Sequence, residues 1–118
     1  MKKILVAEDN DSNFILMTYI LKKYYQYERA KNGQEAVEMV DKDNYDIVLM
    51  DIKMPIMDGL EATRAIKEKH PDLPIIALTA NAFDSDRQLA VDAGCNDFLS
   101  KPVSSDLCLK TIRKFLGE

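Results

Sequence analysis

Carboxylate side chains follow two apolar runs that lie far apart in the sequence. Glu8 and Asp9 come directly after residues 3–7 (KILVA), and Asp51 follows residues 46–50 (DIVLM). Three carboxylates that converge within a few ångströms repel one another, so without a cation at least one would hold a proton at elevated pH. A divalent metal removes this conflict, and an all-oxygen site suits Mg²⁺ or Mn²⁺. If the fold brings these two segments together, the residues predict a divalent cation site.

Two further runs end in groups that suit phosphoryl chemistry. Thr79 ends residues 74–79 (PIIALT), and Lys101 follows residues 97–100 (DFLS). Mg²⁺ in proteins usually takes one or two carboxylates together with phosphate oxygens. Metal, lysine and hydroxyl together can neutralise the three equatorial oxygens of a transferring phosphoryl group. One carboxylate is then left to act as the nucleophile.

The elements that must position these groups alternate along the chain. Short apolar runs, predicted as strands, lie at residues 3–7, 27–30, 46–50, 74–79 and 97–100. Amphipathic segments, predicted as helices, lie at residues 12–24, 33–43, 58–69, 84–93 and 104–116. Three of the runs are continuously apolar, as strands covered by helices on both faces should be. The pattern predicts an α/β fold, a doubly wound parallel sheet of five strands with five helices.

Ligands of such a sheet bind outside the carboxyl ends of the strands, where the strand order reverses. For the common five-stranded order 2-1-3-4-5, this point lies between the first and third strands. These are the strands that end at Glu8–Asp9 and at Asp51. That order would therefore bring all three carboxylates to one crevice.

Composition narrows the class of protein. The chain has 118 residues, of which 47% are hydrophobic and 31% charged, so we expect a single domain over residues 1–118 with one core. The net charge of −4 offers no basic surplus for nucleic acid. Cys95 and Cys108 have no metal-type spacing and are interpreted as small apolar residues. The first apolar stretch is too short for a signal peptide or a spanning helix, which favours a cytoplasmic protein without membrane contact.

The blocks AEDN, LMDIKMPIMDG, ALTA and DFLSKP together resemble the signature of the response-regulator receiver domain of two-component and phosphorelay signalling. The resemblance spans essentially the whole chain and implies the flavodoxin-like strand order 2-1-3-4-5. It implies that Asp51 accepts a phosphoryl group from a phosphohistidine in a Mg²⁺-dependent reaction, and that self-dephosphorylation is slow. Asp9 would bind the metal directly and Glu8 through water, and the backbone carbonyl of Lys53 would complete the protein ligands.

The same resemblance assigns a conformational switch. Thr79 and Lys101 would contact the phosphoryl oxygens, and Phe98 would be the aromatic residue that follows Thr79 inward and remodels the surface for a downstream partner. Lys101-Pro102 resembles the cis peptide of the family. The side chains of Lys53 and Asn81 occupy positions that tune how fast the phosphoryl group is lost, in a direction that the sequence does not predict.

A docking surface is predicted on the helix at residues 12–24. On a helical wheel a core stripe gathers on one face, formed by Leu16, Met17, Ile20, Leu21 and Tyr24. Ile15 and Tyr19 point elsewhere, and Phe14 lies at the edge of that second patch. The resemblance implies that this helix contacts a histidine-bearing helix bundle, either a histidine kinase dimerisation domain or a histidine phosphotransfer protein. The lone histidine, His70, is predicted to be exposed and lacks the helical setting of a phosphodonor.

Three alternatives stay open at this point. A haloacid dehalogenase-like phosphohydrolase needs a second aspartate where this chain has Lys53. A flavodoxin needs a phosphate cradle where this chain is acidic. A receiver-like module that binds partners without phosphorylation would not need the complete set of acids, threonine and lysine. The blocks DGLEATRAI and ALTANAF look most like receivers at the C-terminal end of hybrid histidine kinases, with a stand-alone regulator as the second possibility.

Overall fold

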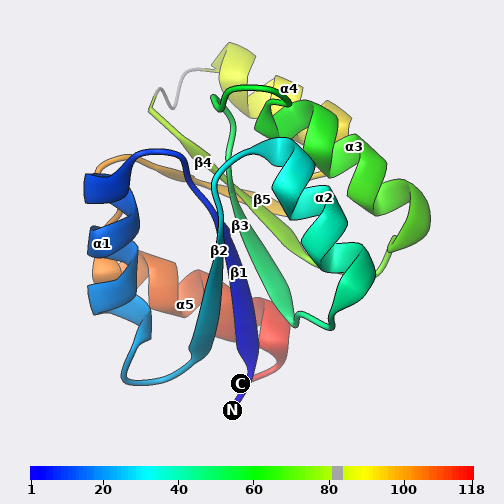
Figure 1. Cartoon of the computed structure of the whole chain (residues 1–118). Helices are drawn as coiled ribbons and strands as arrows, with labels where there is room; N and C mark the ends of the chain where they lie inside the picture. The colour runs from blue at the N-terminus through cyan, green and yellow to red at the C-terminus, as the bar shows by residue number, and fades with distance from the viewer. Residues whose placement is uncertain (81–83) are drawn as a thin grey trace.

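The computed structural model describes residues 1–80 and 84–118, which form a five-stranded parallel sheet flanked by five helices (Figure 1). The strands are β1 (Lys3–Ala7), β2 (Gln26–Ala30), β3 (Ile47–Asp51), β4 (Ile75–Thr79) and β5 (Asp97–Ser100). Their order across the sheet is β2-β1-β3-β4-β5, with every neighbouring pair parallel. The predicted fold class and strand order are confirmed.

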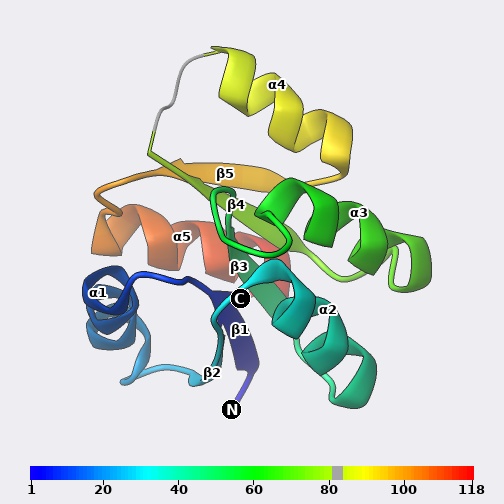
Figure 2. The same ribbon diagram turned by 45° about the horizontal axis from the view of Figure 1, so that its top comes forward.

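The helices cover both faces of this sheet. They are α1 (Asp11–Leu21), α2 (Gly33–Lys42), α3 (Gly59–Lys69), α4 (Asp84–Ala93) and α5 (Ser105–Leu116). Figure 2 shows α1 and α5 together on one face, and α2 and α3 on the other with α4 beyond them. No helix among the described residues is long and apolar enough to span a bilayer.

Side-chain caps fix where several helices begin. Asn10, Asn32, Asp58 and Ser104 each accept a hydrogen bond from the backbone N–H three residues further on. Such caps satisfy one of the free donors of the first turn and are worth about 1 kcal/mol each. Two of them follow directly on the loops that leave β1 and β3, so the caps also fix the path of the chain past the carboxyl edge of the sheet.

Two apolar clusters hold the layers together, one on each face of the sheet. The first joins Ile4, Val6, Leu49 and Leu78 to Met17, Ile20 and Leu21 of α1 and to Cys108 and Ile112 of α5. The second joins Leu5, Val48, Met50 and Ile75 to Ala36 and Val40 of α2 and to Ala62 and Ile66 of α3. The strand residues alternate between the two clusters, which is why these runs are apolar at every position.

The first helix is shorter than the sequence pattern predicts, and two residues of its predicted core stripe are wrongly placed. Met17, Ile20 and Leu21 are buried, but Leu16 is 42% exposed and Tyr24 is 48% exposed. The helix ends at Leu21, so the wheel no longer applies to Tyr24. Instead Tyr25 is buried, and its hydroxyl donates to Glu118 Oε1 at 2.8 Å. Leu16 lines a small hollow together with Pro102 and Val103. The helical wheel therefore predicted the side of the helix on which Leu16 lies, but not that its neighbours would leave it partly exposed.

The loop after β3 is packed tightly against the sheet through two glycines. The Gly59 N–H donates to the carbonyl of Ile52 at 2.8 Å, and a Cβ built on Gly59 would lie 2.0 Å from the carbonyl oxygen of Asp51. Gly33 makes a similar approach, with its N–H 2.9 Å from the Met57 carbonyl. Ile56 adopts the left-handed region at φ 70°, which is rare for a β-branched residue. This close packing at Gly59 fixes the backbone that carries Asp51.

Candidate acid-lysine site

Three carboxylates converge at the carboxyl edge of the sheet, as the strand ends predict. Parallel pairing sets Ala7 of β1 beside Met50 of β3, so Glu8 and Asp9 leave β1 next to Asp51. One oxygen from each carboxylate lies within 4.8 Å of the others. Glu8 and Asp51 are buried, whereas Asp9 is exposed. The set offers hard oxygen ligands and an open side, which fits a Mg²⁺-type cation that keeps some of its water.

Lys101 reaches into this cluster from the end of β5. Its Nζ lies 2.8 Å from Glu8 Oε1 and 3.1 Å from Asp51 Oδ2. Burial works to lower the pKa of the Lys101 ammonium, but its hydrogen bond to Glu8 and the charge of Asp51 outweigh burial and raise the pKa. The lysine is therefore held charged between two buried acids.

The Glu8 carboxyl group is buried beside Asp51 and Lys101. Burial raises the pKa of Glu8 to about 7, and its hydrogen bond with Asp51 adds to the effect, while Lys101 opposes it. Lys101 thus offsets part of the repulsion predicted from the sequence, and the raised pKa of Glu8 favours its protonated form. The carboxyl oxygens of Glu8 also accept from the Asn10 N–H at 3.3 Å. Its predicted water-mediated metal contact stays a prediction.

A cavity of about 180 Å³ opens beside Asp51, lined by the other residues that the sequence singled out. Asp51, Lys53, Thr79 and Lys101 contribute to its wall together with Asp86. The Thr79 hydroxyl donates to Asp86 Oδ2 at 3.4 Å. Asp86 lies in the first turn of α4, and sequence reasoning missed it because an acid there is common in helices. The cavity brings a nucleophile, a cation and a hydroxyl to one space.

Lys53 contacts the site through its backbone. Its N–H donates to Asp51 Oδ1 at 3.3 Å, and its side chain is exposed. A broader groove of about 500 Å³ borders the site here, lined in part by Asp9, Lys53, Pro55 and Leu89. This groove is the open approach to the carboxylates. Asn81, the other position predicted to tune phosphoryl loss, lies outside the described residues.

Phe98 lies on β5, away from the carboxylates. The ring is half-buried, and the Arg87 guanidinium of α4 lies 4.8 Å from its centroid. A hollow of about 190 Å³ borders the ring, with Val91 and Cys95 in its wall. The ring is neither fully buried nor fully exposed, and its role as a switch stays a prediction. Lys101-Pro102 is a cis peptide bond, as the resemblance implied.

The predicted docking residues lie on the outer side of α1. Ile15 is 51% exposed and Tyr19 is 64% exposed, with the Lys22 ammonium 4.8 Å from the Tyr19 ring. Phe14 is half-buried, and its ring meets Tyr27 edge-on with centroids 6.1 Å apart. The exposed patch predicted from the wheel is present, with Phe14 at its buried edge.

Arg29 of β2 is a second residue that sequence reasoning missed. Its Nε donates to the carbonyl oxygen of Glu8 at 3.0 Å, and its Nη2 donates to that of Asp9 at 3.2 Å. The signal lies in strand pairing, since Arg29 pairs with Val6 and so lies beside the end of β1. An isolated arginine in a weak strand pattern gives no hint of this contact.

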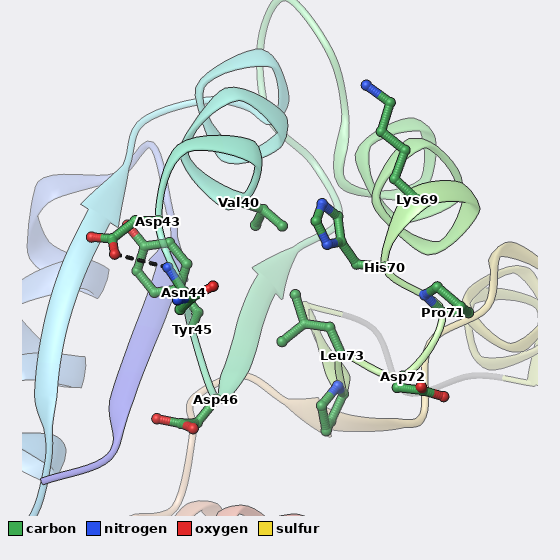
Figure 3. A pocket seen from close by; sticks show the side chains of 11 residues that line it. Val40, Asp43, Asn44, Tyr45, Asp46, Lys69, His70, Pro71, Asp72 and Leu73 are labelled. Carbon is green, nitrogen blue, oxygen red and sulfur yellow. Dashed lines mark hydrogen bonds between the residues drawn. The ribbon is translucent and has the colours of Figure 1, made fainter.

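A separate hollow of about 470 Å³ lies at the opposite, amino edge of the sheet (Figure 3). Some of its side chains make hydrogen bonds, either to the backbone of its wall or to residues outside it. Asp43 accepts from the Asn44 N–H at 2.8 Å, and His70 Nε2 lies 3.0 Å from Asp41 Oδ1. This bond to His70 lowers the pKa of Asp41. The predicted exposure of His70 is only partly correct, because its side chain is 36% exposed.

The fold and this site together define a flavodoxin-like receiver. The sequence matches the response regulator receiver domain family over residues 4–113. The chain therefore belongs to the receiver domain family of two-component phosphorelay signalling. The haloacid dehalogenase and flavodoxin alternatives are set aside by this membership.

Two curated relatives show the range of proteins that carry such a domain. The chain is 44% identical over 132 residues to hybrid signal transduction histidine kinase B of Dictyostelium discoideum, matching 99% of this chain and 7% of the relative. It is 33% identical to the polar-differentiation response regulator DivK of Brucella anthropi, matching 99% of this chain and 98% of the relative. The chain thus spans a small part of the first relative and nearly all of the second.

Two solved structures are similar along almost the whole chain. The receiver domain of a sensor histidine kinase from Pseudomonas aeruginosa, with magnesium coordinated in its active site cleft, is 35% identical with a TM-score of 0.93, over 99% of this chain and 98% of the other. A receiver domain from Saccharomyces cerevisiae, crystallised with a histidine phosphotransfer protein, is 31% identical with a TM-score of 0.91, over 97% and 88%. Receiver domains thus interact with histidine phosphotransfer proteins.

Proposed function

We propose that this receiver domain is phosphorylated on Asp51, in a reaction that requires Mg²⁺. One observation carries the proposal: the buried Asp51 carboxylate lies between two acids and the Lys101 ammonium, which is 3.1 Å from its Oδ2, and it faces a cavity. A carboxylate in a structural ion pair would not need two further acids beside it or an open space in front of it. Residues 1–118 act in this proposal as one receiver unit.

The transfer step is a displacement at phosphorus. An oxygen of Asp51 attacks the phosphorus of a phosphohistidine while the P–N bond breaks, and the imidazole leaves with that electron pair and takes up a proton. Lys101 is placed to stay beside the transferred oxygens, because its ammonium already contacts Asp51. The Thr79 hydroxyl, which donates a hydrogen bond to Asp86 in this structure, turns toward a phosphoryl oxygen. Slow hydrolysis of the aspartyl phosphate then resets the domain.

The residues at the site fit the proposed metal. Asp9 and Asp51 would bind Mg²⁺ directly, Glu8 would bind through water, and the backbone carbonyl of Lys53 would complete the protein ligands. Mg²⁺ supplies neutralisation of the negative charge shared by the carboxylates and the phosphoryl oxygens. Mn²⁺ has the same preference for oxygen ligands and would replace it. The magnesium in the related Pseudomonas receiver supports this assignment.

The switch and the docking surface complete the proposal. Movement of Thr79 toward the phosphoryl group vacates space that the half-buried Phe98 fills, which changes the surface formed by α4 and β5. The α1 patch of Phe14, Ile15 and Tyr19 receives the donor, a histidine phosphotransfer protein or the dimerisation domain of a histidine kinase. The similarity to hybrid kinases supports an excised hybrid-kinase module, with the parent protein a histidine kinase. The cytoplasmic location stays a prediction.

Labelling by a small-molecule donor tests the assignment of Asp51. Acetyl phosphate with Mg²⁺ should phosphorylate the native protein, and intact-mass analysis should show one added phosphoryl group. Asp51→Asn should abolish this labelling, whereas Asp72→Asn, an exposed acid elsewhere, should not change it. Omission of Mg²⁺ should also abolish labelling. Persistent Mg²⁺-dependent labelling of Asp51→Asn would refute the assignment, and an unlabelled native protein would favour a partner-binding module without phosphorylation.

A further inference from the structure

Arg29 lies beside the acidic cluster but does not pair with the carboxylates that form it. Its guanidinium donates to the backbone carbonyl oxygens of Glu8 and Asp9, at 3.0 and 3.2 Å, from two different nitrogens. These are the two residues whose side chains converge on Asp51. An arginine placed to neutralise the acids would contact carboxylate oxygens, as Lys101 does. Arg29 instead acts on the main chain that carries them.

The guanidinium is itself held in a fixed place. Its Nη2 lies 2.9 Å from Asp11 Oδ1, and its Cζ lies 4.7 Å from the centroid of the Phe14 ring. Both partners belong to the start of α1, while Arg29 belongs to β2. The Arg29 side chain is only 17% exposed. The arginine therefore bridges two elements across the loop that joins β1 to α1, and the loop carbonyls are held between them.

These contacts connect the backbone of the loop after β1 to β2 and to α1. The carboxylates of Glu8, Asp9 and Asp51 lie close enough to repel one another, and Asp9 is exposed to solvent. Hydrogen bonds from a charged guanidinium to two successive carbonyls are strong and directional, and a lysine cannot reproduce the fork. With the peptide groups of Glu8 and Asp9 oriented, their side chains stay aimed at Asp51.

We propose that Arg29 is a positioning residue for the divalent cation site, and that it raises Mg²⁺ affinity by holding the backbone of Glu8 and Asp9 in the binding geometry. The inference rests on the proposed function, because it takes the carboxylate cluster to be the Mg²⁺ site. It adds to that function a residue from β2 that contacts neither the metal nor the phosphoryl group.

A purely electrostatic role and a positioning role for Arg29 predict opposite effects of its removal on Mg²⁺ affinity. If Arg29 acted only as a nearby cation, its removal would tighten Mg²⁺ binding, because a positive charge would be lost beside a cation site. If it positions the loop, its removal weakens binding. Groups that orient the ligands of a metal typically change its affinity 10- to 100-fold when they are mutated.

Isothermal titration of Mg²⁺ into the metal-free full chain distinguishes the two. Arg29→Gln should bind Mg²⁺ about tenfold more weakly than the native protein, and Arg29→Lys, which keeps the charge, should be weakened to a similar extent. Lys31→Gln is the matched control, since Lys31 is an exposed cation in the next loop and should bind as the native protein does or slightly more tightly. Circular dichroism and urea unfolding confirm that each variant is folded under the titration conditions.

Acetyl phosphate labelling supplies a second measurement. The Mg²⁺ concentration for half-maximal labelling should rise about tenfold in Arg29→Gln, while the rate at saturating Mg²⁺ should stay near the native value, because Asp51 and Lys101 are untouched. Equal or tighter Mg²⁺ binding by Arg29→Gln would overturn the inference and leave the assignment of Asp51 standing. A native protein that binds no Mg²⁺ would overturn both.

Discussion

Gly59 links the packing of the loop to the position of Asp51, and its replacement by alanine tests that link. A Cβ at this position would lie 2.0 Å from the carbonyl oxygen of Asp51 and 2.9 Å from the Cα of Ile52, where contacts below 3.0 Å essentially never occur. Both neighbours are backbone atoms, so the end of β3 or the start of α3 must move by about 1 Å or more to restore ordinary van der Waals contact. The atom displaced first belongs to the proposed phosphoacceptor.

The expected loss of stability follows from two opposing contributions. Alanine is favoured over glycine in a helix by about 1 kcal/mol, and overpacking against backbone costs about 3 kcal/mol, so Gly59→Ala should lose about 2 kcal/mol. An unfolding entropy of about 2.1 cal/mol/K per residue amounts to about 0.25 kcal/mol/K for 118 residues. The melting temperature should therefore fall by about 8 °C.

Thermal unfolding and acetyl phosphate labelling together check the reasoning. Gly59→Ala should be labelled more slowly than the native protein at a temperature where both are folded and at saturating Mg²⁺. Gly117→Ala is the control, because Gly117 has a φ of 72° but no atom within 4 Å of a built Cβ. It should lose about 1 kcal/mol from the left-handed backbone alone and keep the native labelling rate. Native stability and a native labelling rate in Gly59→Ala would show that the close approach of Gly59 does not position Asp51.

Three further changes have expected outcomes. Ile56→Asn should stabilise the protein by about 1 kcal/mol in urea unfolding, because the exposed Ile56 holds a φ of 70° that asparagine tolerates better; a loss would contradict this. Glu8 has a folded pKa of about 7 against an ordinary 4.5, so its contribution to stability is complete below pH 4.5 and lost as the pH rises through 7. Without added Mg²⁺, the urea midpoint of unfolding should thus be lower at pH 8 than at pH 6. Added Mg²⁺, or the substitution Glu8→Gln, should remove the part of this difference that comes from Glu8. If Glu8→Gln shows the same difference as the native protein, ionisation of Glu8 is not its cause. Replacing Ile15 and Tyr19 by serine should slow phosphotransfer from a histidine phosphotransfer protein but not from acetyl phosphate, and equal rates with the protein donor would remove the docking assignment.

Strand ends were the part of the site that the sequence could predict. An apolar run that ends at an acid can be recognised in the sequence. Because the carboxyl ends of parallel strands lie at the same edge of the sheet, such acids are expected to lie close together. Glu8, Asp9, Asp51, Thr79 and Lys101 were found in this way, and the first three form the cluster that the structure brings together. Lys101 lies within ion-pair distance of two of them.

Side chains that act across the sheet could not be predicted in this way. Arg29 reaches the β1 loop only because β2 pairs with β1 in one register, and a shift of one residue would turn it to the other face. Asp86 reaches Thr79 only because α4 begins where it does. The prediction that Leu16 and Tyr24 are buried was wrong for a related reason. A helical wheel assumes an unbroken helix that packs against a neighbour along its whole length. Each of these errors depends on how far apart two elements lie in the fold, and the periodicity of the sequence does not give that distance.

Lys101, burial and Arg29 act on different atoms of the three acids. Lys101 offsets the charge of Glu8 and Asp51, a raised pKa leaves Glu8 partly protonated, and Arg29 orients the carbonyls of the loop. A cation bound among the carboxylates would replace the first two of these effects but not the third. With a cation there, Glu8 would be ionised more readily and Lys101 would pair less strongly with Glu8 and Asp51, so its ammonium could contact a phosphoryl group. The carbonyls of Glu8 and Asp9 that Arg29 contacts are not among the proposed ligands, so its contribution to the geometry should persist through metal binding and phosphorylation alike.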